Sequence, residues 1–261
     1  MADEATTGWF DARIVTGAHP SSLVPPTDRD AIAAHLDTYR MSGALVSAMA
    51  SWLHDPLAGN AEASSVAHSL ANRGVLACWT AVPRTPGELE SLEKLVDQAM
   101  AEGVAAFRVH PHSHGYSPAL LGDLYGALEA NGLPLCVDAG EIGWTDIEAI
   151  ARRFAGLPIV VSSVGYRQLR SLWAVLSDHD NVFVDLVDFA AHQAIEWLAA
   201  NGLADRLLFA TGLGLRDPGE CIMRLAWSGL DDDTVTRIGS GTAARLFGAR
   251  RTGELRVGGQ S

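Results

Sequence analysis

The sequence predicts an α/β fold, a single (β/α)8 TIM barrel, and three observations support this prediction. Eight short apolar runs alternate with eight helical segments, which is typical of βαβ units. Several runs, such as residues 159–161, are continuously apolar, as expected of parallel strands buried on both faces. The length of 261 residues is close to the roughly 250 residues of one such barrel. We therefore predict one domain over residues 1–248 and a flexible polar tail over residues 249–261.

Each predicted strand is a short apolar run bounded by turn residues. In chain order the predicted strands are residues 10–15, 44–48, 75–81, 105–109, 134–137, 159–162, 182–186 and 206–210. Each predicted helix lies between a capping residue or proline and a glycine or polar end. The helices are residues 29–40, 61–72, 86–102, 117–131, 146–154, 168–177, 191–201 and 219–227. An extra C-terminal helix is predicted over residues 231–247, where Asp231 and its neighbours suit a helix N-terminus. Asp28 and Thr145 are the expected N-caps of two helices, and a loop is expected around Asp55 and Gly59.

Charge and composition narrow the class of protein. A net charge of −12 argues against nucleic acid or an anionic membrane as partner, because phosphate binding needs a basic surface. No apolar stretch approaches the roughly 20 residues of a spanning helix, and the first residues lack the features of a signal peptide. Three widely spaced cysteines suit reduced thiols. We therefore expect a cytoplasmic protein that acts on a small molecule.

Polar residues collect at the predicted strand ends, where a barrel of this kind carries its chemistry. Those that we expect to face the pocket are Asp11, Arg13, Arg108, His110, Asp138, Ser163 and Asp185, with Trp144 lining it. Asp11 and Arg13 are two residues apart, so an even strand would place them on one face. For Asp185, capping of the following turn is the competing interpretation.

Four short segments resemble the amidohydrolase-related barrels of the "amidohydrolase 2" group. Leu-Leu-Phe-Ala-Thr-Gly at residues 207–212 is similar to the last-strand motif of that family. Phe-Asp-Ala at residues 10–12 resembles its first strand, and Leu-Pro-Leu at 133–135 its fifth-strand entry. Arg237-Ile238 and the Ala-Ala-Arg-Leu-Phe of residues 243–247 resemble its closing helix. The resemblance covers nearly the whole chain and implies a hydrolase or decarboxylase barrel.

The departures from the family pattern concern its metal ligands. The resemblance places a His-x-His motif on the first strand, histidines on the fifth and sixth strands, and an aspartate after the eighth. The residues at those positions are Arg13, Val15, Asp138, Ser163 and Gly212. Only Asp138 is a strong donor, and Arg13 adds positive charge where the cation would lie. We therefore expect neither a metal nor any other cofactor.

Two arginines and an aspartate at the strand ends suggest an anion-binding pocket. Arg13 and Arg108 would hold a small anionic substrate or its developing negative charge. Asp138 or His110 would transfer protons, since the pKa of histidine lies near working pH. The competing interpretation is a structural salt bridge that closes the barrel mouth.

The run His110-Pro111-His112-Ser113-His114 allows a different metal site. In an extended loop, alternate side chains share a face, and these histidines with Glu141 would converge on a cation. The competing interpretation is a solvated or substrate-contacting loop.

Two functions remain open from the sequence. The first is a metal-independent amidohydrolase-like enzyme that hydrolyses a C–N or C–O bond, or that acts as a decarboxylase or lyase, on a small anionic substrate. The second is a catalytically inactive homologue that binds a metabolite or pairs with an active paralogue. By analogy with related barrels, a homodimer or a hetero-oligomer with a paralogue is expected.

Overall fold

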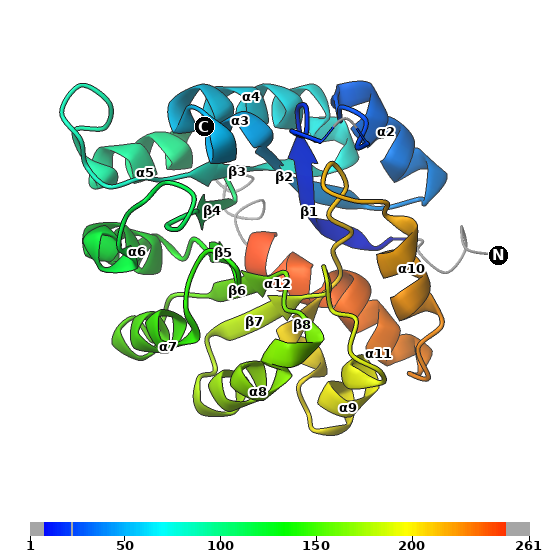
Figure 1. Cartoon of the computed structure of the whole chain (residues 1–261). Coiled ribbons are helices and arrows are strands. Elements are labelled where there is room, and N and C mark those ends of the chain that lie inside the picture. Colours follow the sequence, from blue (N-terminus) through cyan, green and yellow to red (C-terminus); the bar gives the residue numbers. More distant parts are fainter. Residues whose placement is uncertain (1–7, 22, 249–261) are drawn as a thin grey trace, which may run out of the picture.

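Eight parallel strands form a barrel with the helices packed around it, which confirms the predicted fold (Figure 1). The computed structural model describes residues 8–21 and 23–248. The strands follow one another in the order β1 to β8, and every neighbouring pair from β1–β2 to β7–β8 is parallel. The tail predicted over residues 249–261 lies outside the described residues. No helix in the described ranges has the length and apolar character needed to cross a bilayer.

The observed strands lie within about a residue or two of the predicted ones. They are β1 Phe10–Thr16, β2 Gly43–Ala48, β3 Val75–Thr80, β4 Ala106–Val109, β5 Leu135–Asp138, β6 Ile159–Ser162, β7 Val182–Asp185 and β8 Leu207–Leu208. The helices between and after them are α2 Arg29–Thr38, α3 Met49–Leu53, α4 Pro56–Ser69, α5 Leu92–Ala101, α6 Gly122–Asn131, α7 Trp144–Arg153, α8 Leu169–Asp178, α9 Ala194–Ala200, α10 Gly219–Ala226, α11 Asp232–Thr236 and α12 Thr242–Phe247.

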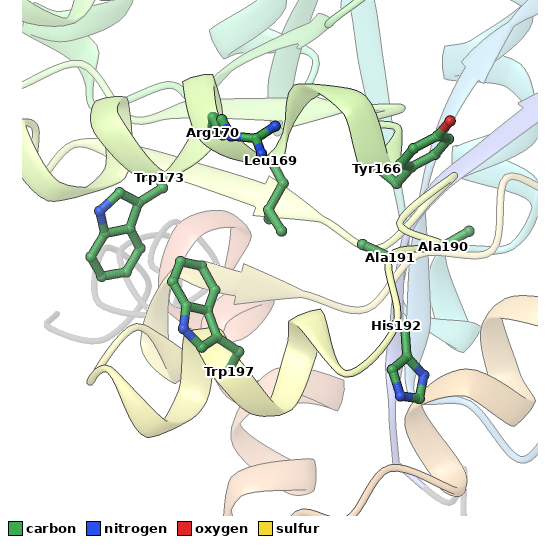
Figure 2. A pocket seen from close by; sticks show the side chains of 8 residues that line it. All are labelled: Tyr166, Leu169, Arg170, Trp173, Ala190, Ala191, His192 and Trp197. Carbon is green, nitrogen blue, oxygen red and sulfur yellow. The ribbon is translucent and has the colours of Figure 1, made fainter.

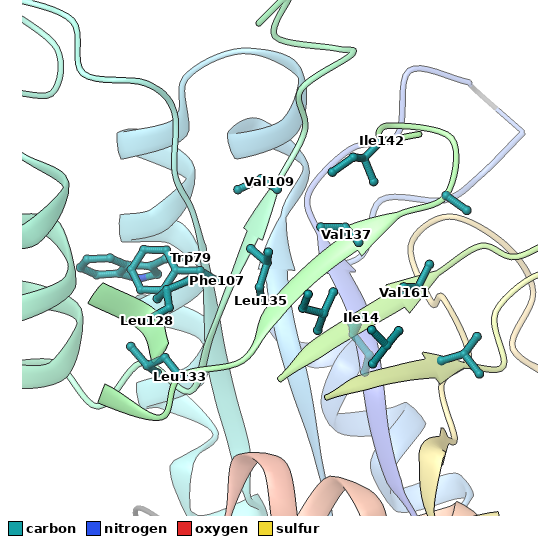
Figure 3. Packing of buried hydrophobic residues seen from close by; sticks show 14 of the residues in the cluster. Ile14, Trp79, Phe107, Val109, Leu128, Leu133, Leu135, Val137, Ile142 and Val161 are labelled. Atoms are coloured by element: carbon teal, nitrogen blue, oxygen red, sulfur yellow. The ribbon is translucent and has the colours of Figure 1, made fainter. Parts of the chain in front are cut away.

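Two apolar layers hold the barrel together. The outer layer lies between strands and helices, where Phe107 and Leu135 belong to the same cluster as Leu128 of α6 (Figure 3). The inner layer fills the barrel with one residue from each strand: Ala12, Leu45, Cys78, Ala106, Cys136, Val160, Phe183 and Leu208. Because side chains alternate along a strand, residues two positions further on face the same interior, nearer the C-terminal ends.

The barrel is closed by the segment that follows β8. The amide of Ala12 donates to the carbonyl of Phe209 at 3.0 Å, and the amide of Gly212 donates to the carbonyl of Arg13 at 3.0 Å. The amide of Val15 then donates to the carbonyl of Leu213 at 2.9 Å. The regular strand is shorter than the predicted residues 206–210, but the chain beyond it still pairs with β1.

The C-terminal helix covers the N-terminal end of the barrel. The predicted helix over residues 231–247 is present as α11 and α12, joined by a π-helical turn, Arg237–Gly241. Ala243 and Phe247 of α12 belong to the inner apolar cluster, and the ring of Phe247 stacks on Phe10 at 6.0 Å between centroids. The floor of the barrel is therefore apolar, which leaves the opposite end for polar chemistry.

The loop predicted around Asp55 and Gly59 is shorter than expected, because α4 begins at Pro56 and not at Ala61. Asp55 caps α4 by accepting hydrogen bonds from the amides of Leu57 and Ala58. Gly59 lies against α3, where an added Cβ would come within 2.2 Å of the amide nitrogen of Ser51. Glycine therefore permits a close contact between two helices here and does not mark a loop.

Two predicted helix starts were also misplaced. The helix predicted from residue 86 begins at Leu92, because Ser91 accepts a hydrogen bond from the amide of Lys94 and caps it there. Thr145 is not an N-cap, since α7 already begins at Trp144 after Gly143. By contrast, Asp28 caps α2 as predicted, through a hydrogen bond from the amide of Ala31.

Candidate active site

Five side chains from five strands form a buried polar cluster, which we call the strand-tip cluster: Arg13, Arg108, Asp138, Ser162 and Asp185. Nη1 of Arg13 lies 2.6 Å from Oδ1 of Asp138, and Nη1 of Arg108 lies 3.0 Å from Oδ2. Strands β1 and β5 are four places apart in the sheet order, so the first ion pair crosses the barrel interior. Arg108, Asp138, Ser162 and Asp185 each stand two residues beyond a member of the inner apolar layer. The cluster therefore lies directly above that layer.

Two serines complete the hydrogen bonds of the cluster. The guanidinium of Arg108 donates to Oγ of Ser162 at 3.3 and 3.4 Å, and Ser162 in turn donates to Oδ2 of Asp185. The other oxygen of Asp185 accepts the amide of Val187 at 3.1 Å. Nη1 of Arg13 is not aligned for a hydrogen bond to Oδ1 of Asp138, and it donates to Oγ of Ser163 at 2.9 Å. The predicted site residues Arg13, Arg108, Asp138, Ser163 and Asp185 are thus brought together.

Ser163 is held in an unusual backbone conformation. Its φ angle is +57°, in the left-handed region that non-glycine residues rarely occupy. This residue follows β6 directly, and its hydroxyl reaches Arg13 from the opposite side of the barrel. Backbone strain of this kind persists only where the surrounding structure enforces it, and it gathers at functional sites.

Asp11 does not join the cluster, and the expectation that Asp11 and Arg13 share a face was wrong. The pairing of β1 with β2 shifts register between Asp11 and Ile14. Oδ2 of Asp11 lies 3.0 Å from Nε2 of His35 on the outer helix α2. Its other contacts are hydrogen bonds from the amides of Arg13 and Thr211 and from the Thr211 hydroxyl. The irregularity turns Asp11 outward while Arg13 enters the barrel.

Replacing Asp11 by alanine should lower the free energy of unfolding by about 3 kcal/mol, because buried donors would lose a charged acceptor. The main losses are the amide and hydroxyl of Thr211, which tie the end of β8 to β1. Urea unfolding followed by tryptophan fluorescence measures this change. A loss under about 0.5 kcal/mol, the range of surface substitutions, would contradict this structural role.

The two carboxylates of the cluster differ in charge environment. Burial opposes ionisation of Asp138, but the guanidinium groups of Arg13 and Arg108 outweigh it and hold the pKa of this carboxyl well below its usual range. For Asp185, burial dominates and raises the pKa to about 6, although Arg13 and the Ser162 hydroxyl oppose the rise. Asp138 is therefore a permanent anion, whereas Asp185 exchanges a proton near neutral pH.

His110 lies beside the cluster, at the end of β4, with 2% of its surface exposed. Its ring stacks on Trp52 of α3 at 5.2 Å between centroids and 12° between planes. Burial lowers the pKa of His110 well below its usual value, even though the charge of Asp138 opposes this shift. The imidazole is therefore neutral at working pH, and its buried Nδ1 has no hydrogen-bond partner in the described part of the chain.

The histidine run after β4 is a compact turn and not an extended loop. The amide of His114 donates to the carbonyl of His110 at 3.0 Å, and the amide of Gly115 donates to the carbonyl of His112 at 3.2 Å. His110 is buried while His112 is exposed. Glu141 is engaged elsewhere, by the amide of Ser113 at 2.8 Å and the indole of Trp52 at 3.1 Å. Alternate side chains of this turn therefore do not share a face, although the predicted metal site of these histidines and Glu141 required it.

The remaining predicted residue, Trp144, begins α7 after β5 and is partly buried, with no partner for its indole N–H among the described residues. Sequence reasoning missed Trp52 and undervalued Ser162. Trp52 was overlooked because its helix α3 directly follows β2 in a stretch with no helical periodicity. Ser162 was not nominated, because its bridging role depends on contacts between β4, β6 and β7 that no local pattern encodes.

A separate cavity of about 770 Å³ lies between α8 and α9, and its lining is mainly aromatic and apolar (Figure 2). Trp173 and Trp197 lie side by side in it, with ring centroids 4.6 Å apart. Arg170 and His192 are the basic side chains of its lining. None of the lining residues belongs to the strand-tip cluster, so this cavity is a competing place for an anion to bind.

The residues of the cluster do not suit a divalent cation. Such an ion needs three or more oxygen, nitrogen or sulfur donors that converge on one point. Both oxygens of Asp138 face guanidinium groups. In residues 8–21 and 23–248, no three His, Cys, Asp or Glu side chains converge in this way. Guanidinium groups therefore occupy the space around Asp138, which is the one strong metal donor at the positions of the family's metal ligands.

The parallel strands and the residues at their ends define the class of protein, a (β/α)8 barrel with a polar cluster at the C-terminal ends of its strands. The chain belongs to the Amidohydrolase family, whose pattern matches residues 11–249. No curated protein matches the sequence closely enough to count as a relative. This family membership confirms the resemblance found in the sequence.

Solved structures share the fold at low sequence identity. 5-Carboxyvanillate decarboxylase from Novosphingobium aromaticivorans, with bound manganese, has a TM-score of 0.73 and 14% identity, over 94% of this chain and 98% of that one. 2,6-Dihydroxybenzoate decarboxylase from Rhizobium has a TM-score of 0.68 and 17% identity, over 94% and 99%. A probable 2-pyrone-4,6-dicarboxylic acid hydrolase from Acinetobacter baumannii, with citric acid bound, has a TM-score of 0.70 and 12% identity, over 93% and 100%. At these identities the likeness shows the fold alone.

Proposed function

We propose that this protein is an amidohydrolase-related enzyme that acts on a small anionic substrate without a metal ion. The observation that carries the proposal is the pair of guanidinium groups at the centre of the barrel. Arg13 and Arg108 are each 3% exposed, and the Nε–H of each has no hydrogen-bond partner among the described residues. Buried donors without partners are costly, and an anionic group would satisfy them.

The chemistry that fits is hydrolysis of a C–N or C–O bond, or a decarboxylase or lyase step. Each passes through a state with developing negative charge, which Arg13 and Arg108 would stabilise. The neighbouring folds named above act on or bind carboxylic acids, which supports an anionic substrate. Asp138 orients the two arginines. The neutral His110, whose Nδ1 has no partner among the described residues, is a proton acceptor.

The second candidate is an inactive homologue that binds a metabolite or pairs with an active paralogue. The favouring observation is that the cluster largely neutralises itself, because both oxygens of Asp138 lie against guanidinium groups and Ser162 links Arg108 to Asp185. Binding without turnover of any carboxylic acid would favour this candidate.

We also propose that the protein works in the cytoplasm as a homodimer or with a paralogue. The three cysteines are unpaired and buried, which suits a reducing compartment. Tyr166, Trp197 and Trp227 are large side chains with exposed fractions of 63, 42 and 78%. Sedimentation measurements at several concentrations test the oligomeric state.

Benzoate binding tests the role of the arginines. We expect Arg13→Gln and Arg108→Gln each to weaken benzoate binding by at least about tenfold, the loss of one charge-assisted hydrogen bond. Isothermal titration calorimetry measures the affinity, and a crystal soaked in benzoate shows where the anion lies.

Arg170→Gln is the matched control, because Arg170 lines the cavity between α8 and α9. If Arg170→Gln abolishes binding while Arg13→Gln and Arg108→Gln do not, the strand-tip cluster is not the anion site. One equivalent of zinc or manganese seated against Asp138 would contradict metal independence.

A further inference from the structure

We propose that an anion binding in the strand-tip cluster is accompanied by uptake of one proton, which Asp185 receives. The proposal rests on the proposed function in one respect, since it needs an anion to bind beside Arg13 and Arg108. It goes beyond that function because it makes anion binding depend on pH and names the residue that takes up the proton. It also gives Asp185 a role different from the direct substrate contact expected from the sequence.

The first argument is the charge of the buried cluster. Arg13 and Arg108 carry two positive charges, and Asp138 and Asp185, when ionised, carry two negative ones. The cluster is then neutral and has no net attraction for an anion in an interior that penalises unpaired charge. When Asp185 is protonated, the cluster carries one excess positive charge, which a monovalent anion would balance.

The second argument is that the two carboxylates are not equivalent in their contacts. Asp138 has a guanidinium against each oxygen, at 2.6 and 3.0 Å. Asp185 is wholly buried, and its partners are the hydroxyl of Ser162 and the amide of Val187. No residue in the described ranges forms an ion pair with Asp185. A carboxylate in that position loses less when it is protonated, so the proton goes to Asp185.

Charged and titratable groups face Asp185 from every side. They are Arg13 on β1, Arg108 on β4, Cys136 and Asp138 on β5, and Cys221 on α10, besides the Ser162 hydroxyl on β6. Burial raises its pKa to about 6, Arg13, Ser162 and Arg108 oppose this rise, and Asp138 adds to it. An anion that pairs with the arginines would weaken their opposition and add a negative charge, so the pKa of Asp185 would rise further.

Ser162 provides the physical link between Asp185 and the anion. With Asp185 ionised, the Ser162 hydroxyl donates to Oδ2 of Asp185 and its oxygen accepts from Arg108. With Asp185 protonated, a proton from solvent forms an O–H bond on Oδ2, which then donates to Oγ of Ser162. The Ser162 hydroxyl, whose O–H bond stays intact, no longer donates to Asp185 and can donate to the bound anion instead. No electrons are transferred in this exchange.

Calorimetry of benzoate binding in buffers of different ionisation enthalpy counts the protons taken up. Benzoate stays ionised across the range from pH 6 to 8, so it contributes none of its own. We expect close to one proton per bound benzoate at pH 7, and an affinity that falls by up to about tenfold per pH unit above the Asp185 pKa of about 6.

Two variants decide the assignment. Asp185→Asn should bind benzoate with an affinity independent of pH and without proton uptake, because the amide is permanently neutral. Asp188→Asn is the matched control in the segment that follows β7, where the native carboxylate forms a partly exposed pair with Arg216, and it should keep the proton uptake of the wild type. Asparagine tolerates the left-handed backbone of this position, where φ is +61°.

A second measurement, the pH dependence of stability, follows the same proton without any ligand. A folded pKa above the unfolded value means that the folded state holds the proton more tightly. Wild-type stability should therefore fall as pH rises from about 4 through 6, and Asp185→Asn should lack this fall. An unchanged fall in the variant would overturn the assignment to Asp185.

The outcomes separate the two proposals. Benzoate binding at the cluster without proton uptake would leave the proposed function standing and overturn the coupling. An absence of benzoate binding between pH 5 and 8 would overturn the proposed anion site, and the coupling with it. Proton uptake that persists in Asp185→Asn would overturn the role of Asp185 alone.

Discussion

Replacing Asp138 by asparagine is expected to lower the free energy of unfolding by about 3–5 kcal/mol, the cost of removing one partner from a buried ion pair. Arg13 and Arg108 are buried, and Asp138 is the carboxylate that pairs with both. An amide would leave two guanidinium groups without a contacting counter-charge in a low-dielectric interior. Urea unfolding at pH 7 measures the loss, and a loss below about 1 kcal/mol would contradict the predicted cost of the two buried charges.

Asp37→Asn is the matched control for this prediction. Asp37 pairs with Arg73 at the surface, where its side chain is 65% exposed, so its loss should cost about 0–1 kcal/mol. The acid dependence gives a second check. Because the pKa of Asp138 is depressed, its contribution is complete above the ordinary aspartate pKa and is lost as pH falls below it. The acid-induced fall in stability should therefore be smaller in the Asp138→Asn variant.

Replacing Gly214 by alanine should destabilise the protein by about 3 kcal/mol or more, because it combines backbone strain with a steric clash. Gly214 has a φ angle of +92°, and an added Cβ would lie 2.0 Å from the carbonyl oxygen of Val15. Val15 belongs to the hydrogen-bonded seam between β1 and the segment after β8. The chain would have to move where the barrel closes, and a thermal melt by circular dichroism would record the loss.

Gly103→Ala separates the two causes. Gly103 also has a left-handed φ, +73°, but an added Cβ there would meet no atom within 4 Å. Its replacement should cost only the backbone strain, about 1–2 kcal/mol. Equal losses in the two variants would mean that the clash at the seam is absent.

The fold could be predicted because its signals are local. Each strand is a short apolar run, and each run occurs with a helical segment of suitable length, so alternation along the chain specifies the architecture. Errors arose where a residue had two physical uses. Gly59 indicated a loop, yet it allows α3 and α4 to touch, and Pro86 suggested a helix start that Ser91 provides further along.

The candidate site could be predicted only in part. The position of Arg13, Arg108, Asp138 and Asp185 at strand ends was enough to nominate them, since the fold brings all strand ends together. Their individual roles depend on distances that the sequence does not contain. Asp11 was misassigned because strict alternation was assumed across a register shift, and the hydrogen bonds from Thr211 come from 200 residues away.

The irregular pairing in β1 also determines which kinds of mutation this barrel can tolerate. The shift between Asp11 and Ile14 adds one residue to β1 and lets two residues that are two positions apart serve opposite sides of one strand. If β1 paired evenly at its present length, either the Asp11 carboxylate or the Arg13 guanidinium would be rotated to the wrong side. Redesign of the pocket therefore has to preserve the irregular pairing together with the extra residue that causes it.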